Sequence, residues 1–486
     1  MIMYAKAFVE RYNVCTAPGE GKMFLHLIDA GSFFIRLLLV ASLSGCAAYT
    51  PKPLNYEPTF LHEIPHVIAD KREMPLPEPP RRAFNPDVGL NMTDVAILAV
   101  INNPDLKVAR DEQGIARAQL TAAGILPNPQ LTAGLAYPTN SGPGFVTAFN
   151  LGLSYDIASI ITRSASIDAA HANSLKIDLT VLWQEWQVVQ QSRLLFIKVT
   201  EQEKVMDQLR TYRELVAERY RRSSSALQKG FLTIDAVSTD LTVLQDADSR
   251  IADLVLQISK TSHDLNALLG LSPEVGLALV GGGDLAEPDD VKVEVYIKEL
   301  PRRRPDLLAL QAGYDSQEQL FRKAILAQFP AVNIGIIRAR DTINVYTTGV
   351  GVTLNLPIFD RNQGNIAIEK ATRLRLYDEY QARLNSANSQ ARQVLDNLRL
   401  LRWRYKKAQE ILPKLETAVN RSKSALDAGN MNITTYSDLF SALLNKRIEA
   451  LTIRQNILEE NVMLQTLLGA DLTVHITPAD IKLDKR

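Results

Sequence analysis

The sequence contains the same order of short segments twice, and this repeat limits the folds that the chain can adopt. The phrase "SALQKG" begins at Ser225 and "SALDAG" begins at Ser424, an offset of 424 − 225 = 199 residues. "NPDL" and "RPDL" open the two copies, and "LLG" closes both. The matching anchors are Pro104 and Pro305, Pro129 and Pro330, and Leu268 and Leu467. A period this long exceeds that of solenoid repeats, so the pattern predicts a two-fold internal duplication.

Each half begins with a helical pattern, over residues 92–126 and 303–328, which a proline ends. Two stretches of alternating residues follow in each half. The clearest are "FVTAFNLGLSYD" (145–156) and "VYTTGVGVTLNL" (345–356), where large apolar and aromatic residues alternate with small and polar ones. Alternation over about ten residues is typical of membrane β-barrel strands. Each hairpin taken alone also fits a soluble hairpin with one hydrated face.

Very long helical patterns come after the strands, over residues 158–228 and 358–427. Each turns back after its copy of "SAL..G" into a second helix. In the second half, apolar residues recur every three or four positions, with one polar exception at Ser422, as in a coiled-coil seam. Pro413 is expected to bend that helix locally or to mark a register change. Gly230 and Gly429 are predicted to lie at the helix–helix turns, where a residue with positive φ is useful.

The small number of strands indicates that the chain assembles with copies of itself. Four strands per chain cannot close a barrel in lipid, and an open edge there leaves backbone groups unpaired. Three copies would supply 3 × 4 = 12 strands. No apolar run reaches the ~18 residues that a membrane-spanning helix needs. Lys and Arg balance Asp and Glu at 54 each, which argues against a nucleic-acid or anionic-surface partner recognised by bulk charge.

The segment "RLLLVASLSGC" resembles a bacterial lipoprotein signal that ends at Cys46. We therefore expect residues 1–45 to be removed as a signal peptide, and Cys46 to carry a diacylglycerol and an N-acyl chain such as palmitate. A start at Met23 gives a signal of ordinary length, so residues 1–22 are expected to be an upstream extension. Ala47 favours sorting to the outer membrane, and the processed chain would have no cysteine pair for a disulfide.

The duplicated order of helix, proline, hairpin and long helical hairpin resembles the TolC-like outer-membrane efflux proteins. The resemblance covers about residues 90–470 and rests on "RPDLLALQAGYDSQEQLFRKAILAQFPAV", "VGVTLNLPIFDRNQGNIAIEKA", the two "SAL..G" turns and the two "LLG" ends. It implies an α+β membrane protein: a homotrimer whose 12-stranded barrel lies in the outer membrane of a Gram-negative bacterium and continues into a periplasmic α-helical barrel.

The same resemblance implies a passive exit duct in a tripartite efflux system. A periplasmic adaptor would connect it to an inner-membrane pump of the resistance-nodulation-division type, and the cargo would be small molecules or metal ions. The "NPDL" form also resembles members that serve heavy-metal pumps. The expected segments are a signal (1–45), a lipidated tether (46–90), a first efflux repeat (91–270), an equatorial linker (271–302), a second efflux repeat (303–470) and a C-terminal tail (471–486). Tether, linker and tail are expected to form a collar.

Family positions also place the candidate functional residues at the periplasmic tips. Counted from Gly429, the two acidic gate positions of the family fall on Thr435 and Asp438, so a single ring of Asp438 carboxylates is the hypothesis, against a solvated turn acid or helix cap. Asp235 and Asp240 are weaker candidates. Adaptor docking is expected at turn residues that are small or apolar: Leu227, Gly230, Leu232, Leu426, Gly429 and Ile433.

No enzyme chemistry, metal site or dissociable cofactor is predicted. "HEIPH" matches the zinc-protease pattern, but Pro65 between its histidines prevents the helix that would align them. "GGGD" at 281–284 lacks the strand and helix of a phosphate-binding loop. Two alternatives stay open: a type I secretion duct that exports proteins, and a soluble periplasmic coiled-coil scaffold.

Overall fold

The computed structural model describes residues 49–65, 89–139, 142–282 and 289–469. The chain divides into two compact units, Met1–Thr59 and Phe60–Arg486. In the first unit only residues 49–59 are described, and they form neither helix nor strand. Cys46, the signal segment and the C-terminal tail lie outside the described residues. All elements named below belong to the second unit.

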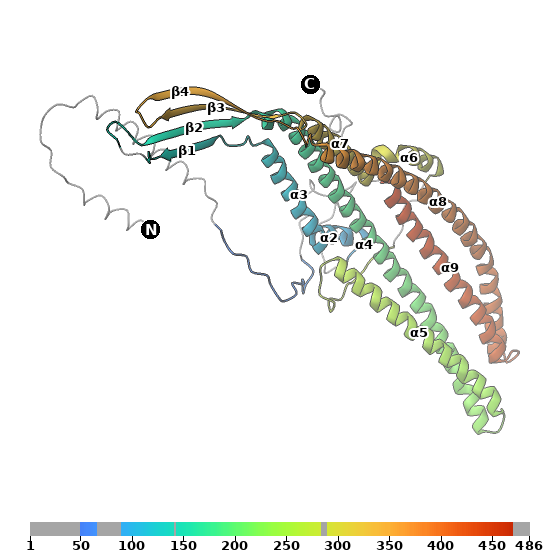
Figure 1. Ribbon diagram of the computed structural model, residues 1–486. Coiled ribbons are helices and arrows are strands. Elements are labelled where there is room, and N and C mark those ends of the chain that lie inside the picture. Colours follow the sequence, from blue (N-terminus) through green and yellow to red (C-terminus); the bar gives the residue numbers. More distant parts are fainter. Residues whose placement is uncertain (1–48, 66–88, 140–141, 283–288, 470–486) are drawn as a thin grey trace, which may run out of the picture. The chain divides into compact units, whose positions relative to one another are not determined.

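The second unit repeats one order of elements, two helices, two strands and two long helices (Figure 1). In the first half these are α2 (Met92–Asn102), α3 (Pro104–Gly124), β1 (Gln130–Ala136), β2 (Ala148–Asp156), α4 (Ile157–Gln228) and α5 (Ile234–Leu268). In the second half they are α6 (Asp290–Arg303), α7 (Pro305–Leu326), β3 (Ala331–Arg340), β4 (Tyr346–Asn355), α8 (Gln363–Asp427) and α9 (Ile433–Leu468). No described helix is both long and apolar enough to cross a membrane.

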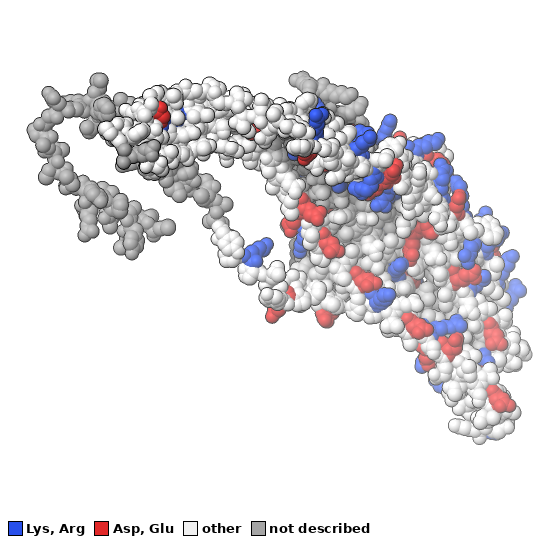
Figure 2. Space-filling view, in the orientation of Figure 1, with Lys and Arg blue, Asp and Glu red and all other residues white. Residues whose placement is uncertain are grey.

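The four strands form one antiparallel sheet in the order β1-β2-β3-β4. Residues opposite each other point to the same side, so the register sorts the alternating sequence into two faces. One face carries large apolar side chains such as Leu153, Ile336 and Val350, and all three are exposed. The other face carries mainly small residues such as Ser154, Gly335 and Gly351. In Figure 2 the sheet region is almost free of charged side chains, whereas the helices carry both signs.

The first predicted helix, 92–126, was wrong in its continuity, because the structure divides it into α2 and α3 at Asn103. The residue before a proline avoids helical geometry, and Pro104 opens α3. Asn103 is buried, and its side chain both accepts and donates a hydrogen bond. Its Oδ1 accepts from the Leu106 N–H at 3.0 Å, and its Nδ2 donates to the Leu268 carbonyl at 3.0 Å. The break therefore connects the start of the first half to the end of α5.

Two other boundaries and the content of the linker differ from the prediction. The strand expected from residue 145 begins at Ala148, and the helix expected from residue 358 begins at Gln363. Asn362 delays that helix because its backbone is left-handed, with φ of 62°, and its side chain donates to the Ala324 carbonyl at 2.8 Å. The linker 271–302 contains most of helix α6.

Short backbone bridges join the tether to the linker inside the second unit. Leu61 pairs with Leu271, and Leu90 pairs with Leu279. Leu90 and Leu271 are both buried in a cluster that also holds Leu195 on α4 and Leu269 directly after α5. The expected contact between tether and linker is therefore present, whereas the C-terminal part of the expected collar lies outside the described residues.

The long helices pack as two antiparallel hairpins, α4 with α5 and α8 with α9, and α4 also contacts α9. Every buried residue of α8 except Leu395 belongs to the predicted seam, and the polar member Ser422 is among them. Helix α8 continues through Pro413. The buried residues of α4 do not form a single stripe, because this helix packs against α2, α3, α5, α7 and α9.

Two glycines that share a left-handed backbone give a matched test of this packing. Gly270 has φ of +67°, and a Cβ there would lie 2.8 Å from the Asn102 carbonyl oxygen, whereas Gly230 has φ of +75° and open space around it. Gly230→Ala should cost about 1 kcal/mol of stability through backbone strain alone, and Gly270→Ala should cost more. Thermal unfolding of the purified protein, followed by circular dichroism, measures the difference. Equal midpoints for the two variants would contradict the proposed contact.

Candidate functional site at the ends of the helical hairpins

The two copies of the repeated phrase fold into turns with the same hydrogen bonds. In the first turn the Phe231 N–H donates to the Ala226 carbonyl at 2.8 Å and the Gly230 N–H to the Leu227 carbonyl at 2.9 Å. In the second turn the equivalent distances, from the N–H groups of residues 430 and 429 to the carbonyls of residues 425 and 426, are 2.8 and 3.0 Å. This is the Schellman pattern, which requires a left-handed residue, and glycine takes that position in both.

The turns differ in the residues that follow the glycine. After Gly230 the chain exposes Phe231, Leu232 and Ile234. After Gly429 it exposes Asn430 and Asn432, and the Asn432 side chain caps α9 by accepting from the Thr435 N–H at 2.7 Å. The first turn therefore presents an apolar surface and the second a polar one.

A buried arginine joins three helices next to these turns. The Arg219 guanidinium, on α4, contacts the Asp240 carboxylate on α5 at 2.7 Å. It also donates to the Ser437 hydroxyl at 2.8 Å and to the Asp438 carboxylate at 3.2 Å, both on α9. Arg219 and Asp240 are almost fully buried, whereas the Asp438 side chain is 70% exposed. The cluster of Arg219, Asp240, Ser437 and Asp438, called the tip cluster below, thus connects the two hairpins of one chain.

The structure places the predicted gate residues in different surroundings. Asp438 and Thr435 both lie on the first turns of α9 and are exposed. Asp235 is exposed at the start of α5. Asp240 is buried against Arg219, so it does not present a free charge. The gate role of Asp438 and Thr435 stays a prediction.

The predicted docking residues gather at the same end of the hairpins. Gly230 and Gly429 are exposed and have no atom within 4 Å of an added Cβ. A groove of about 410 Å³ lies beside the tip cluster, and Leu232 and Ile433 line it together with Arg219 and Asp240. Leu426 packs under the second turn against the cluster around Val419 and Tyr436.

One tyrosine close to the tip cluster, Tyr436, has a shifted pKa. Burial raises the pKa of the Tyr436 phenol, and the nearby Asp427 carboxylate adds to this because it opposes a second negative charge. With its pKa raised, the phenol is neutral at physiological pH. Tyr436 packs against Phe440, with 6.2 Å between the ring centroids.

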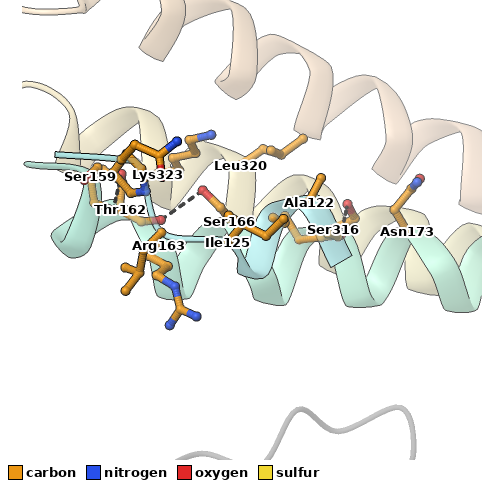
Figure 3. Close-up of a pocket in the computed structure, with 16 residues that line it drawn as sticks. Ala122, Ile125, Ser159, Thr162, Arg163, Ser166, Asn173, Ser316, Leu320 and Lys323 are labelled. Carbon is orange, nitrogen blue, oxygen red and sulfur yellow. Dashed lines mark hydrogen bonds between the residues drawn. The ribbon is translucent and has the colours of Figure 1, made fainter. Parts of the chain in front are cut away.

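A larger groove, of about 780 Å³, lies at the other end of the helices, between α3, α4 and α7 (Figure 3). Its walls combine apolar residues, several of them alanines, with polar side chains such as Ser159, Ser166 and Asn173. The Ser316 hydroxyl donates to the Ala169 carbonyl at 2.8 Å, and the Ser166 hydroxyl donates to the Thr162 carbonyl at 3.0 Å. Arg163 donates to the Gly124 carbonyl at 2.5 Å, at the end of α3. These groups satisfy backbone carbonyls and form no arrangement of nucleophile and base.

The described residues hold no group of three or more His, Cys, Asp and Glu side chains that could bind a metal ion. Within "HEIPH", residues 62–65 are not helical, and His66 lies outside the described residues. The motif therefore does not form the helical zinc site that its letters suggest.

Sequence reasoning missed Arg219, Ser437 and Asn432. Arg219 lies in a stretch of α4 rich in arginine and glutamate, which looks like a solvated helix face. Its partner Asp240 is 21 residues away and its partner Ser437 is 218 residues away, so no local spacing links them to Arg219. Only the Asn432 cap had a local signal, an asparagine immediately before a helical pattern.

A four-stranded sheet with one apolar face is joined here to two long helical hairpins. Solved structures share this fold. A crystal structure of CusC matches 83% of this chain and 99% of its own, with a TM-score of 0.64 and 16% identity. The CmeC outer membrane channel of Campylobacter jejuni matches 90% of this chain and 98% of its own, with a TM-score of 0.64 and 16% identity.

The sequence comparisons agree with the fold. Residues 296–470 match the model of the outer membrane efflux protein family. The cobalt-zinc-cadmium resistance protein CzcC of Cupriavidus metallidurans is 26% identical over 397 residues, which is 80% of this chain and 92% of CzcC. The predicted resemblance to TolC-like efflux proteins is confirmed, as is the prediction of an outer-membrane efflux protein in place of an enzyme.

Removal of the buried arginine should weaken the tip far more than removal of its exposed partner. Arg219→Gln leaves the buried Asp240 carboxylate unpaired, which costs about 3–5 kcal/mol. Asp438→Asn removes an exposed pair and should cost at most about 1 kcal/mol. Amide hydrogen exchange near the start of α5 and α9, followed by mass spectrometry, measures the local opening. Arg222→Gln is the control, because Arg222 pairs with Glu218 on the exposed surface, and equal exchange in both arginine variants would contradict a structural role for Arg219.

Proposed function

We propose that the protein is the outer-membrane exit duct of a tripartite efflux system and works as a homotrimer. Three sheets of four strands would join into a 12-stranded barrel, and the helical hairpins would continue it as an α-helical barrel in the periplasm. The observation that carries this proposal is the sheet: one exposed apolar face, one face of small residues, and two outer strands that each pair on one side only.

The outer strands give the physical reason for a trimer. β1 pairs only with β2, and β4 pairs only with β3. In a bilayer the free N–H and C=O groups of these strands would have no water to bond, so the edges must meet other strands. Joining β4 of one copy to β1 of the next removes every edge, and the small residues of the other face then line the lumen.

A passive duct needs partners that supply energy and cargo. The exposed apolar residues after Gly230 and the polar residues after Gly429 suit contact with a periplasmic adaptor, and the adaptor would link the duct to an inner-membrane pump of the resistance-nodulation-division type. CzcC is a cobalt-zinc-cadmium resistance protein, and it is similar along 92% of its length. This similarity favours divalent metal cations as the cargo.

The proposal includes a lipid anchor on Cys46. Of the two alternatives, the soluble scaffold is opposed by the exposed apolar sheet face, and no described feature favours export of folded or unfolded proteins.

The proposal is tested by isolating the full-length protein from outer membranes and reconstituting it in planar bilayers. We expect a trimer that dissociates only on heating in detergent and that forms ion-conducting channels. A soluble monomer in the periplasmic fraction would contradict the proposal.

The same bilayer assay tests the acidic ring. Three Asp438 carboxylates near one axis would attract cations, so Asp438→Ala should lower the preference for cations and weaken block by divalent cations. Asp396→Ala is the control, since Asp396 is an exposed acid on α8 far from the turns. Unchanged selectivity in Asp438→Ala would show that this carboxylate is a solvated turn acid.

Adaptor docking is tested at the second turn. Gly429→Trp should abolish cross-linking to the adaptor while trimers still form, because the new ring would occupy open space at the contact. Gly429→Ala introduces the same left-handed strain without the bulk and should retain cross-linking. Normal cross-linking of Gly429→Trp would count against docking at this turn.

A further inference from the structure

We propose that Arg338 and Arg340 bind phosphate groups of anionic lipid headgroups in the outer leaflet of the outer membrane. Both arginines lie on the apolar face of the sheet, beside the β3–β4 hairpin. The inference rests on the proposed barrel, in which this face contacts lipid.

The register places the two arginines on the lipid-facing side. Arg338 lies opposite Leu151 on β2 and Thr348 on β4, and Arg340 lies opposite Phe149 and Tyr346. The rest of this face is apolar apart from three hydroxyl-bearing residues. Its members are Leu131, Ala133, Leu135, Phe149, Leu151, Leu153, Tyr155, Val332, Ile334, Ile336, Tyr346, Thr348, Val350, Val352 and Leu354.

No acid on this face neutralises the arginines. Among the described residues, Arg338 has neither an ion pair nor a hydrogen bond from its side chain, and its guanidinium is exposed. β3 is an inner strand, so both its neighbours come from the same chain and the strands of another subunit lie beyond β4 or β1. A cation on a lipid-facing surface is costly unless it meets a counter-charge, and the counter-charge here must come from outside the protein.

Arg340 is held in place by its surroundings and keeps donors to spare. Its Nη2 and Nε donate to the Thr147 carbonyl at 2.6 and 3.2 Å. Its guanidinium carbon lies 5.4 Å from the Phe149 ring centre and 5.8 Å from that of Tyr346. The neighbouring acid, Asp341, is engaged in the turn, because its Oδ1 accepts from the N–H groups of Ile343 and Val345. Its Nη1 also donates to the Tyr346 hydroxyl at 3.4 Å. A guanidinium has five N–H donors, so two remain for a phosphate.

The position along the strands matches a headgroup layer. On β4, rows of this face run from Tyr346 to Leu354, and at ~6.8 Å per two residues and a tilt of about 40° they span roughly 20 Å, close to the apolar band of a membrane barrel. The arginines occupy the row at the hairpin end and the next one. Helices α4 and α8 follow the opposite ends of β2 and β4. With the helices in the periplasm, the arginines reach the outer leaflet, where an arginine is least costly and where aromatic residues also gather.

Phosphate is the anion that this pair suits. Guanidinium groups bind phosphate through paired N–H donors and are weakly hydrated, which favours them over lysine at a lipid boundary. Two arginines separated by one residue on the same face can contact one headgroup with two phosphates, or two neighbouring headgroups. A lipid bound here would fill the boundary between the sheet and the outer leaflet.

The test measures binding of fluorescent bisphosphorylated lipid A to the full-length trimer in zwitterionic detergent. We expect salt-sensitive binding that falls by about tenfold or more in Arg338→Gln, the loss expected for a charge-assisted hydrogen bond. Arg338→Lys should retain part of the affinity. Arg361→Gln is the matched control, an exposed arginine near the helix end of the sheet, and it should bind like the wild type.

Several results would overturn the inference. They are equal affinity in Arg338→Gln and wild type, equal binding of lipid A stripped of both phosphates, and displacement by inorganic phosphate at the concentration of the lipid, which would indicate a free-phosphate site. A change of ion selectivity in Arg338→Gln would place the side chain in the lumen and would also overturn it. Trimer formation and conductance are measured on the same samples, so failure of the duct is distinguished from failure of the lipid site.

Discussion

The unpaired outer edges of β1 and β4 determine most of what this chain can be. A sheet of four strands with an apolar face cannot remain open in either water or lipid without exposing backbone groups or hydrocarbon. Closure by copies of the same chain removes both costs. The small residues of the opposite face then enclose a water-filled lumen, and the helices that follow the strands are brought side by side around the same axis.

Buried ion pairs fix how the helices meet at several levels. At the tip, Arg219 joins α4 to α5 and α9. Near the middle of α4, Glu201 is fully buried and contacts Lys204 at 2.7 Å and, on α9, Arg454 at 3.6 Å. At the start of α7, the Arg304 guanidinium donates two hydrogen bonds to the Asp306 carboxylate and lies over the Trp183 ring.

Such pairs add little net stability, but a mispaired helix would leave a charge buried. We interpret them as devices that select one packing register along helices whose apolar seams contain many small residues. This role would explain why charges occur inside the contact between the two halves, where an apolar residue would pack as well.

Local patterns predicted much of the fold. The period-two stretches became strands, and the two glycines became left-handed turns, because strand alternation and turn geometry depend on neighbouring residues. The break at Asn103 had a local signal in Pro104, but its strength depends on the Leu268 carbonyl, which only the folded chain brings near. The sheet register had no such signal, and without it Arg338 could not be assigned to the apolar face.

The tip cluster lay beyond prediction for the same reason. Arg219 is one of several arginines in its stretch of α4, and nothing in the letters marks it as the buried one. Family positions pointed to Asp438 as a lone acid. The structure instead shows Asp438 as the exposed member of a network whose buried members are Arg219, Asp240 and Ser437.

The two strand-to-helix joints differ in how directly they connect the helix to the sheet. β2 ends at Asp156 and α4 begins at Ile157, with the Asp156 side chain accepting from the Ala158 N–H at 2.9 Å. Between β4 and α8 lie residues 356–362, including left-handed Asn362. A helix that continues a strand without a loop takes its direction from that strand. The loop before α8 sets the direction of the second hairpin separately from the sheet.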